Sequence, residues 1–307
     1  MYSGPIIDTL LHTPWLGPPG ASDPRGDVVD WSGDARLRRV MQTFQHETTP
    51  GDSEGNLTRD QLLKEMEGAQ VERAVIPAKV YYPTSVASVK SLHEVMADFV
   101  GGTQDKLMAV GTIVPPESGP GSYWDVLQTT EMLTETVNKF GFVGTHIVPA
   151  SWAMPPNHKW FYPLYAKCVE LRVAVFVHVG MPGPLWPMGP NNPQYLDEVA
   201  LAFPDLTIIA HHIGDPWTDI SVRLAARHQN VYICTSAWMP IRYPHHLVEF
   251  MRGTWHGTPG SKKVLFASDF PLLDMKKTTD QARALDISDD GLADFLYNNA
   301  RRLFWPE

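Results

Sequence analysis

The sequence predicts an α/β protein: a single, distorted (β/α)8 TIM barrel in which parallel strands alternate with helices. Short β-branched runs alternate with amphipathic segments along the whole chain, and the number of such runs is the eight that closes a barrel. Several runs end abruptly in a histidine or an aspartate. Because the carboxyl ends of parallel strands meet at one mouth, these polar residues are expected to gather there.

Composition supports one large domain over residues 1–307, since 43% of the residues are hydrophobic. The net charge of −9 and the lack of a basic run argue against nucleic acid or an anionic membrane as partner and favour a small molecule. The two cysteines, Cys168 and Cys234, suit reduced thiols in a cytoplasmic protein. The amino terminus lacks a leader-like apolar core, and no apolar stretch reaches the ~18 residues of a membrane span.

The predicted strands are short, apolar and rich in β-branched residues, which is typical of a parallel sheet buried on both faces. In chain order they are Ile6–Asp8, Arg73–Pro77, Leu107–Val114, Phe142–Val148, Val173–His178, Leu206–His212, Val231–Ser236 and Lys263–Ser268.

The predicted helices fill the gaps between these strands and show apolar residues at helical spacing. They are Arg59–Ala69, Ser88–Val100, Trp124–Phe140, Trp160–Leu171, Gln194–Ala202, Thr218–Arg227, Pro244–Arg252 and Ala293–Leu303, the last preceded by a capped start at Ser288. A long irregular insertion, about residues 13–56, follows the first strand and is rich in Gly, Pro, Asp and Ser. We expect it to lie over the barrel mouth.

Candidate catalytic residues close four of the predicted strands: His12, His178, the pair His211 and His212, and Asp269. Three such side chains plus water would form an open zinc or manganese site, and the metal would lower the pKa of its bound water towards ~7. The alternative is that polar residues end these strands without a common function. Because side chains alternate along a strand, we expect only one of His211 and His212 to face the barrel interior, the other lying in the helix layer or in a hydrogen bond.

A second pattern consists of tryptophans that follow five of the strands, often with a methionine nearby. These are Trp15, Trp152, Trp186, Trp217 and Trp238. Such a rim would suit an apolar or aromatic substrate ring, although the same residues could pack the loops or a dimer interface. His146, on the fourth strand, is a further candidate for substrate binding.

The chain resembles the amidohydrolase-related family that includes aminocarboxymuconate semialdehyde decarboxylase, aromatic-acid decarboxylases and lactone hydrolases. The motifs that carry the resemblance are Ile7-Asp8-Thr9-Leu10-Leu11-His12, Phe161-Tyr162-Pro163-Leu164-Tyr165, Val175-Phe176-Val177-His178-Val179-Gly180, His212-Ile213-Gly214, Phe266-Ala267-Ser268-Asp269-Phe270-Pro271 and Asn299-Ala300-Arg301-Arg302-Leu303-Phe304. The resemblance implies that His178 and Asp269 are metal ligands and that His212 is a general acid or base. It also implies that Arg223 binds a substrate carboxylate, in some relatives across a homodimer interface.

The sequence departs from the family at the first strand, where relatives carry Asp-x-His-x-His. Alignment on Asp8 places the second histidine at His12 but puts Leu10, which cannot ligate a metal, at the first. Three outcomes follow: His12, His178 and Asp269 hold a divalent metal (Zn or Mn) with fewer ligands, the loop after the first strand supplies a substitute, or the site works without metal through His212 and Asp269.

The resemblance thus predicts an enzyme that acts on a small ring-bearing or unsaturated carboxylate. The first hypothesis is metal-assisted, non-oxidative decarboxylation, with His212 and Asp269 carrying the proton. The second is metal-dependent hydrolysis of a lactone, ester or amide. A third is a degenerate barrel that binds a ligand without catalysis, for which Leu10 is the only support.

Overall fold

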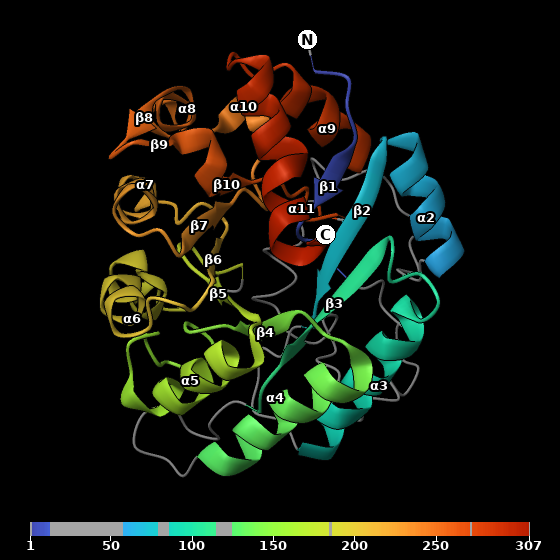
Figure 1. Cartoon of the computed structure of the whole chain (residues 1–307), viewed down its shortest axis with the longest axis vertical. Coiled ribbons are helices and arrows are strands. Elements are labelled where there is room, and N and C mark those ends of the chain that lie inside the picture. The colour runs from blue at the N-terminus through green and yellow to red at the C-terminus, as the bar shows by residue number, and fades with distance from the viewer. Residues whose placement is uncertain are drawn as a thin grey trace.

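The computed structural model describes residues 2–12, 58–78, 86–114, 125–183, 186–270 and 272–306. Within these residues, eight parallel strands form one sheet in the order β1-β2-β3-β4-β5-β6-β7-β10, as the sequence predicts for a TIM barrel. The helices α2 to α8 surround the strands (Figure 1). The predicted insertion at about residues 13–56 lies outside the described residues.

Each predicted strand is present, although most are shorter than expected at their carboxyl ends. They are Ile6–Asp8 (β1), Val71–Pro77 (β2), Leu107–Thr112 (β3), Gly144–Ile147 (β4), Ala174–His178 (β5), Ile208–His211 (β6), Val231–Cys234 (β7) and Val264–Leu265 (β10).

The strands alternate between two buried surfaces. One set of side chains fills the barrel interior, including Ile7 of β1, Val75 of β2, Phe176 of β5 and Ile209 of β6. The intervening residues pack against the helices in two outer clusters. Burial on both faces explains the continuous apolar runs in the sequence. It also fixes the inward direction of residues further along each strand, because side chains alternate.

The barrel closes between β1 and β10 through contacts just beyond the regular ladder. Leu11 forms a parallel bridge with Phe270, and the His12 amide donates to the Phe270 carbonyl at 2.8 Å. The Asp269 amide donates to the Leu10 carbonyl at 3.0 Å. This closure places the first and the last strand of the sheet side by side. His12 and Asp269, which are 257 positions apart in the sequence, therefore become neighbours.

The described helices are Arg59–Gly68 (α2), Val86–Val100 (α3), Val126–Phe140 (α4), Tyr162–Leu171 (α5), Leu196–Ala202 (α6), Thr218–Arg227 (α7), His245–Arg252 (α8), Met275–Arg283 (α9), Asp289–Ala293 (α10) and Asn299–Phe304 (α11). Their starts follow from capping side chains: Thr58 forms a capping box at α2, and Ser288 accepts from the Gly291 amide at α10, as predicted. None of the helices in the described residues has the length and apolar character that a membrane crossing requires.

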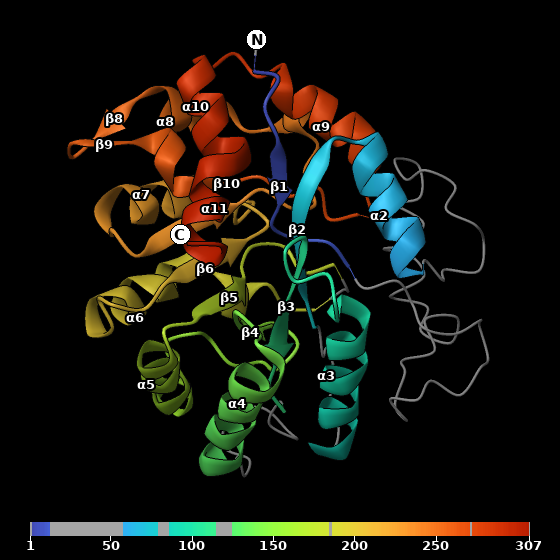
Figure 2. The same cartoon turned by 45° about the vertical axis from the view of Figure 1, so that its right-hand side comes forward.

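Two elements were not predicted. The helix α9 lies beside α2 in both views (Figures 1 and 2) and is largely polar, so apolar spacing does not reveal it. The hairpin of Thr254–Trp255 (β8) and Thr258–Pro259 (β9) turns at His256 and Gly257, both with positive φ. A His-Gly turn lacks the Asn or Asp that usually indicates such a hairpin.

The last helix forms the floor of the barrel, at the end opposite the mouth. Phe304 of α11 stacks on Phe176 with ring centroids 5.6 Å apart, and Ala300 and Trp305 belong to the same interior cluster. Figure 1 shows α11 in front of the strands, across the centre of the barrel. The predicted helix Ala293–Leu303 is therefore present, but it begins with a π-helical turn at Asp294–Asn298.

Candidate active site

The seam between β1 and β10 brings together two predicted site residues. His12 Nε2 lies 2.7 Å from Asp269 Oδ1, and the side chain of Asp269 is 2% exposed against 29% for His12. The backbone bonds that close the barrel hold both residues in place, because one links Asp269 to Leu10 and the other links His12 to Phe270. A buried carboxylate in contact with a more exposed imidazole can pass or receive a proton at the mouth.

The second pair lies at the junction of β5 and β6. The rings of His178 and His212 have centroids 4.3 Å apart, and both side chains are almost fully buried. His178 ends β5 and pairs in register with His211, the last residue of β6. The ladder thus places His178, and His212 follows one residue beyond the end of β6.

The expectation that only one of His211 and His212 faces the barrel interior is wrong. The strand β6 ends at His211, and the next residues turn left-handed, with φ of 70° at His212, 53° at Ile213 and 82° at Gly214. Alternation applies only within a strand, so it does not determine the direction of His212. The turn places His212 against His178, while His211 keeps the inward direction that its register with His178 requires.

His211 therefore lies in the barrel interior and not in the helix layer. Its ring lies 5.3 Å from that of Phe176 and 5.3 Å from that of His146, which points inward from β4. His146, a candidate for substrate binding, thus lies beside His211 in the barrel interior, and the His211 ring in turn lies 5.7 Å from that of His212. The structure brings it near the mouth cluster, and its role towards a substrate stays a prediction.

Asp8 was not assigned a role from the sequence but supports the seam. Its carboxylate is fully buried and accepts from the Leu10 amide at 3.1 Å and from the Ser268 amide at 3.1 Å to each oxygen. Burial raises the pKa of Asp8 to about 7, against the lowering effect of these hydrogen bonds. The Asp8 side chain thereby ties Ser268, the residue before Asp269, to Leu10, the second residue after β1.

Ser236 was also missed, although it ends the predicted seventh strand at the mouth. Its hydroxyl lies 2.9 Å from His212 Nδ1, and the residue is fully buried. The only signal in the sequence was its position at the end of a strand, which serine shares with many residues that have no function.

Two other predicted residues, Trp152 and Arg223, make aromatic and cation–π contacts elsewhere in the fold. Trp152 packs with Phe161 in the layer between the sheet and the helices, so its predicted place on the pocket rim is not supported; a loop tryptophan next to an apolar helix face is buried there. Arg223 is exposed on α7, and its guanidinium lies 5.6 Å from the centre of the Trp255 ring. Trp186, Trp217 and Trp238 are half-buried, and Trp15 lies outside the described residues.

The described residues supply an incomplete set of metal ligands. Among them, no group of three His, Cys, Asp or Glu side chains lies close enough to hold a metal ion. His12 and Asp269 are in contact with each other, whereas His178 contacts His212, and Leu10 is a fully buried apolar residue. The contacts of the described residues thus link His12 to Asp269 and His178 to His212, and the predicted ligand triad stays a prediction. A substitute ligand from the loop after β1 would lie outside the described residues.

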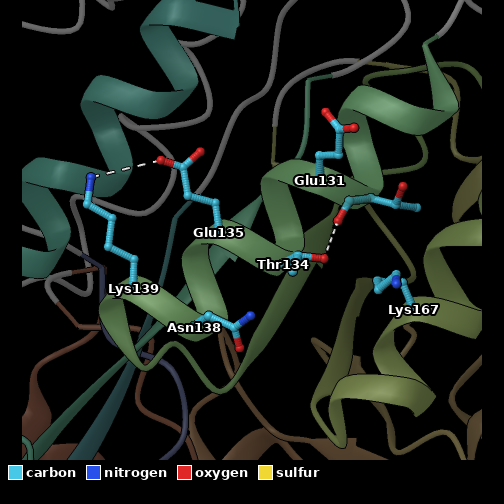
Figure 3. Close-up of a pocket in the computed structure, with 7 residues that line it drawn as sticks. Glu131, Thr134, Glu135, Asn138, Lys139 and Lys167 are labelled. Atoms are coloured by element: carbon cyan, nitrogen blue, oxygen red, sulfur yellow. Dashed lines mark hydrogen bonds and ion pairs between the residues drawn. The ribbon is translucent and has the colours of Figure 1, made fainter.

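A separate hollow of about 370 Å³ lies on the outer surface over α4 and α5 (Figure 3). Its lining is mixed in charge: Thr130, Glu131, Thr134, Glu135, Asn138, Lys139 and Lys167. Glu135 also binds Lys90 of α3 at 2.8 Å. The hollow contains none of the predicted site residues, so the chemistry is assigned to the barrel mouth.

Comparison with known proteins gives the same fold. An uncharacterised TIM-barrel protein of Bordetella bronchiseptica has 22% sequence identity and a TM-score of 0.74, with 99% of each chain covered. The 2,6-dihydroxybenzoate decarboxylase of Rhizobium has 17% identity and a TM-score of 0.68, again with 99% of each chain covered. A 5-carboxyvanillate decarboxylase of Novosphingobium aromaticivorans, solved with manganese and a nitrobenzoic acid ligand, has 15% identity and a TM-score of 0.70, covering 99% of this chain and 97% of that one.

No curated protein matches the sequence. A family model described as amidohydrolase matches residues 7–305, which is nearly the whole chain and includes both pairs at the mouth. This agrees with the resemblance seen in the sequence motifs. The chain therefore belongs to the amidohydrolase family of enzymes.

Proposed function

We propose that this enzyme removes CO2 from a small aromatic or unsaturated carboxylate without oxidation. The observation that carries the proposal is the meeting of two pairs, His12 with Asp269 and His178 with His212, at one mouth of an amidohydrolase barrel. The solved proteins of similar fold include decarboxylases of 2,6-dihydroxybenzoate and 5-carboxyvanillate. These are carboxylated rings, the substrate class that the sequence predicts.

In the proposed reaction the bond between a ring carbon and the carboxylate carbon breaks. CO2 leaves, the bonding electron pair stays with the ring carbon, and that carbon takes up one proton. His212 donates this proton to the ring carbon, and a proton that enters from solvent through His12 and Asp269 then replaces the one that His212 has lost. His178 packs against His212 and limits the positions that its ring can occupy.

We also propose that the mouth takes up one divalent metal ion, manganese or zinc. His12, His178 and Asp269 carry the nitrogen and oxygen donors that such ions use in proteins, and the similar 5-carboxyvanillate decarboxylase holds manganese. The described residues supply only an incomplete ligand set for such an ion. Metal content after loading with Mn2+ or Zn2+ tests the point: one ion per chain is expected, and none in Asp269→Ala.

A panel of hydroxylated benzoates and of lactones distinguishes decarboxylation from hydrolysis. CO2 release and uptake of deuterium from D2O at the ring carbon are expected with a benzoate, whereas ring opening of a lactone would support hydrolysis. For hydrolysis, water would attack the carbonyl carbon and give one proton to Asp269 or His212; the bond from that carbon to the leaving oxygen or nitrogen would then break, and the leaving atom would take up this proton.

Variants then test the named roles. His212→Ala and Asp269→Ala should each lower kcat by roughly 100-fold or more, since each removes a proton carrier. His256→Ala, an exposed histidine of the β8–β9 hairpin, is the matched control and should keep full activity. Full activity in either site variant would contradict the proposed mechanism, and inactivity of wild-type enzyme on the whole panel would favour a barrel without catalysis.

A further inference from the structure

A chain of buried side chains leads from the strand β1 to His212. It contains Thr9, Cys234 and Ser236, all fully buried, and ends at Nδ1 of His212. Thr9 Oγ1 lies 3.6 Å from Cys234 Sγ, Cys234 Sγ lies 3.6 Å from Ser236 Oγ, and Ser236 Oγ lies 2.9 Å from His212 Nδ1. These groups belong to the same site as the proposed function but are not used by the reaction steps described for it.

The hydrogen-bond direction along this chain follows from the donors that each group has. The Thr9 hydroxyl donates to the Phe266 carbonyl at 2.8 Å, so its single hydrogen is already used. Burial raises the pKa of the Cys234 thiol to about 11, so the thiol keeps its hydrogen at neutral pH and donates it to Ser236. The Ser236 hydrogen then has His212 Nδ1 as its acceptor.

The reverse direction is less favourable. It would require Ser236 to donate to the Cys234 sulfur, which is a weak acceptor, while the imidazole gave its own hydrogen to Ser236. An imidazole nitrogen is the better acceptor for a hydroxyl. A neutral imidazole that accepts at Nδ1 carries its hydrogen on Nε2, because one ring nitrogen is the donor and the other the acceptor.

We propose that Ser236 is a positioning residue that holds His212 in the tautomer with its hydrogen on Nε2. The residue acts together with backbone contacts from the same strand end, since the Ile213 amide donates to the Cys234 carbonyl at 3.1 Å. His212 itself has a φ of 70°, a conformation that non-glycine residues rarely adopt and that neighbouring contacts must maintain. Cys234 and Ser236, at the end of β7, thus fix the backbone and the ring of His212.

The inference rests on the proposed role of His212 as proton carrier, because a fixed tautomer matters for a ring that donates a proton. The Nε2 hydrogen is the one that the ring can give up while Nδ1 stays bonded to Ser236, and the imidazolate left behind regains a proton from solvent at Nε2. The proposed function predicts proton donation by His212, and this inference names the side chain that keeps the donating nitrogen protonated.

The direct test is 15N NMR of the histidine rings in the full chain, zinc-loaded and labelled with [15N]histidine. The signals of His212 are identified by their loss in His212→Gln. In wild-type protein we expect a pyrrole-type Nε2 with a bound hydrogen and a pyridine-type Nδ1. In Ser236→Ala the Nδ1 signal should move downfield, because the nitrogen loses its donor.

The control is Ser261→Ala, which removes a buried serine hydroxyl near the floor of the barrel and should leave the His212 signals unchanged. Ser236→Cys keeps a hydrogen on a weaker donor, so it should give an intermediate shift and also serves if Ser236→Ala does not fold. A wild-type His212 with its hydrogen on Nδ1 would overturn the proposal, as would an Nδ1 signal that does not move in either Ser236 variant.

Kinetics with an active substrate provide a second measurement. Ser236→Ala should lower kcat by about 10- to 100-fold with KM within about twofold, since the lost contact orients a proton carrier and does not bind substrate. An unchanged kcat together with a shifted Nδ1 signal would show that the tautomer held by Ser236 does not matter for catalysis, and would overturn that claim. If no substrate of the panel is turned over, the proposed function fails, while the NMR result still decides the tautomer.

Discussion

The seam between β1 and β10 and the junction between β5 and β6 each carry one pair of site residues, but they hold the pairs by different means. At the junction, the regular ladder runs through His178 and His211, and backbone geometry places His212. At the seam, the strand β10 has only two residues, and the Asp8 carboxylate takes over from the ladder. The backbone therefore places the residues of the junction pair, whereas at the seam a titratable side chain acts together with the backbone hydrogen bonds that close the barrel.

The largest expected effect is the change with pH of the free energy of unfolding that Asp8 contributes at the seam. The folded-state pKa of Asp8, about 7, lies above the unfolded value of about 3.9, so the folded chain binds more protons between these values. The contribution of Asp8 to the free energy of unfolding is therefore fully present below about pH 4 and is lost as pH rises to about 7, a total of about 4 kcal/mol.

Denaturant unfolding at several pH values measures this loss. Asp8→Asn should have a flatter stability profile than wild type across about pH 4 to 7, and Asp98→Asn, at an exposed aspartate of α3, should follow wild type. Parallel profiles for wild type and Asp8→Asn would show that the seam is no more sensitive to pH than the junction.

Removal of the Asp8 side chain should be the next largest effect. Asp8→Ala leaves the buried amides of Leu10 and Ser268 without their acceptor, which we expect to cost about 3 kcal/mol of unfolding free energy at about pH 5. The same variant should weaken the contact between His12 and Asp269, because the segment before Asp269 loses its tie to β1. A stability within about 0.5 kcal/mol of wild type would show that the backbone bonds alone close the barrel.

The substitution Gly214→Ala should disturb the turn that follows β6 at the junction. This glycine has a φ of 82°, and a Cβ there would lie 2.2 Å from Ser221 Oγ, so Gly214→Ala combines strain with a clash. We expect a loss of about 2 to 3 kcal/mol in thermal or denaturant unfolding. Gly141→Ala is the matched control, because Gly141 has a φ of 70° but open space around it, and should lose only about 1 kcal/mol. Equal losses would mean that the close packing under the His212 turn is unimportant.

The smallest effect is expected at Arg223, which lies outside both regions. Arg223→Ala removes an exposed contact with the Trp255 ring and should change the unfolding free energy by about 0.5 kcal/mol. Because the guanidinium contacts the β8–β9 hairpin of its own chain, kcat/KM of a monomer should not change. A raised KM in a variant that remains dimeric by light scattering would restore its predicted role in carboxylate binding across the interface.

The sequence predicts the barrel well because burial on both faces makes each strand a continuous apolar run, as in Val173–Val177. The alternation of side-chain directions, however, no longer holds one residue beyond the end of a strand. His212 follows β6 in a left-handed turn, and no local signal distinguishes it from a continuing strand, so the inward direction of His211 was missed. Ser236 and Asp8 act through contacts with residues far along the chain, at separations of 24 and 260 positions. Such contacts depend on the closed barrel and cannot be read from spacing.

The floor of the barrel has a consequence for the order in which the molecule can be assembled during synthesis. Phe304 covers Phe176 from below, and Asp269 is the partner of His12, so both ends of the interior depend on residues near the carboxyl terminus. While a ribosome is still translating those residues, the first half of the chain holds an incomplete apolar interior open to water. A barrel closed in this way folds to its final state after its last helix has emerged, and translation speed over the final segment sets how long that interior stays exposed.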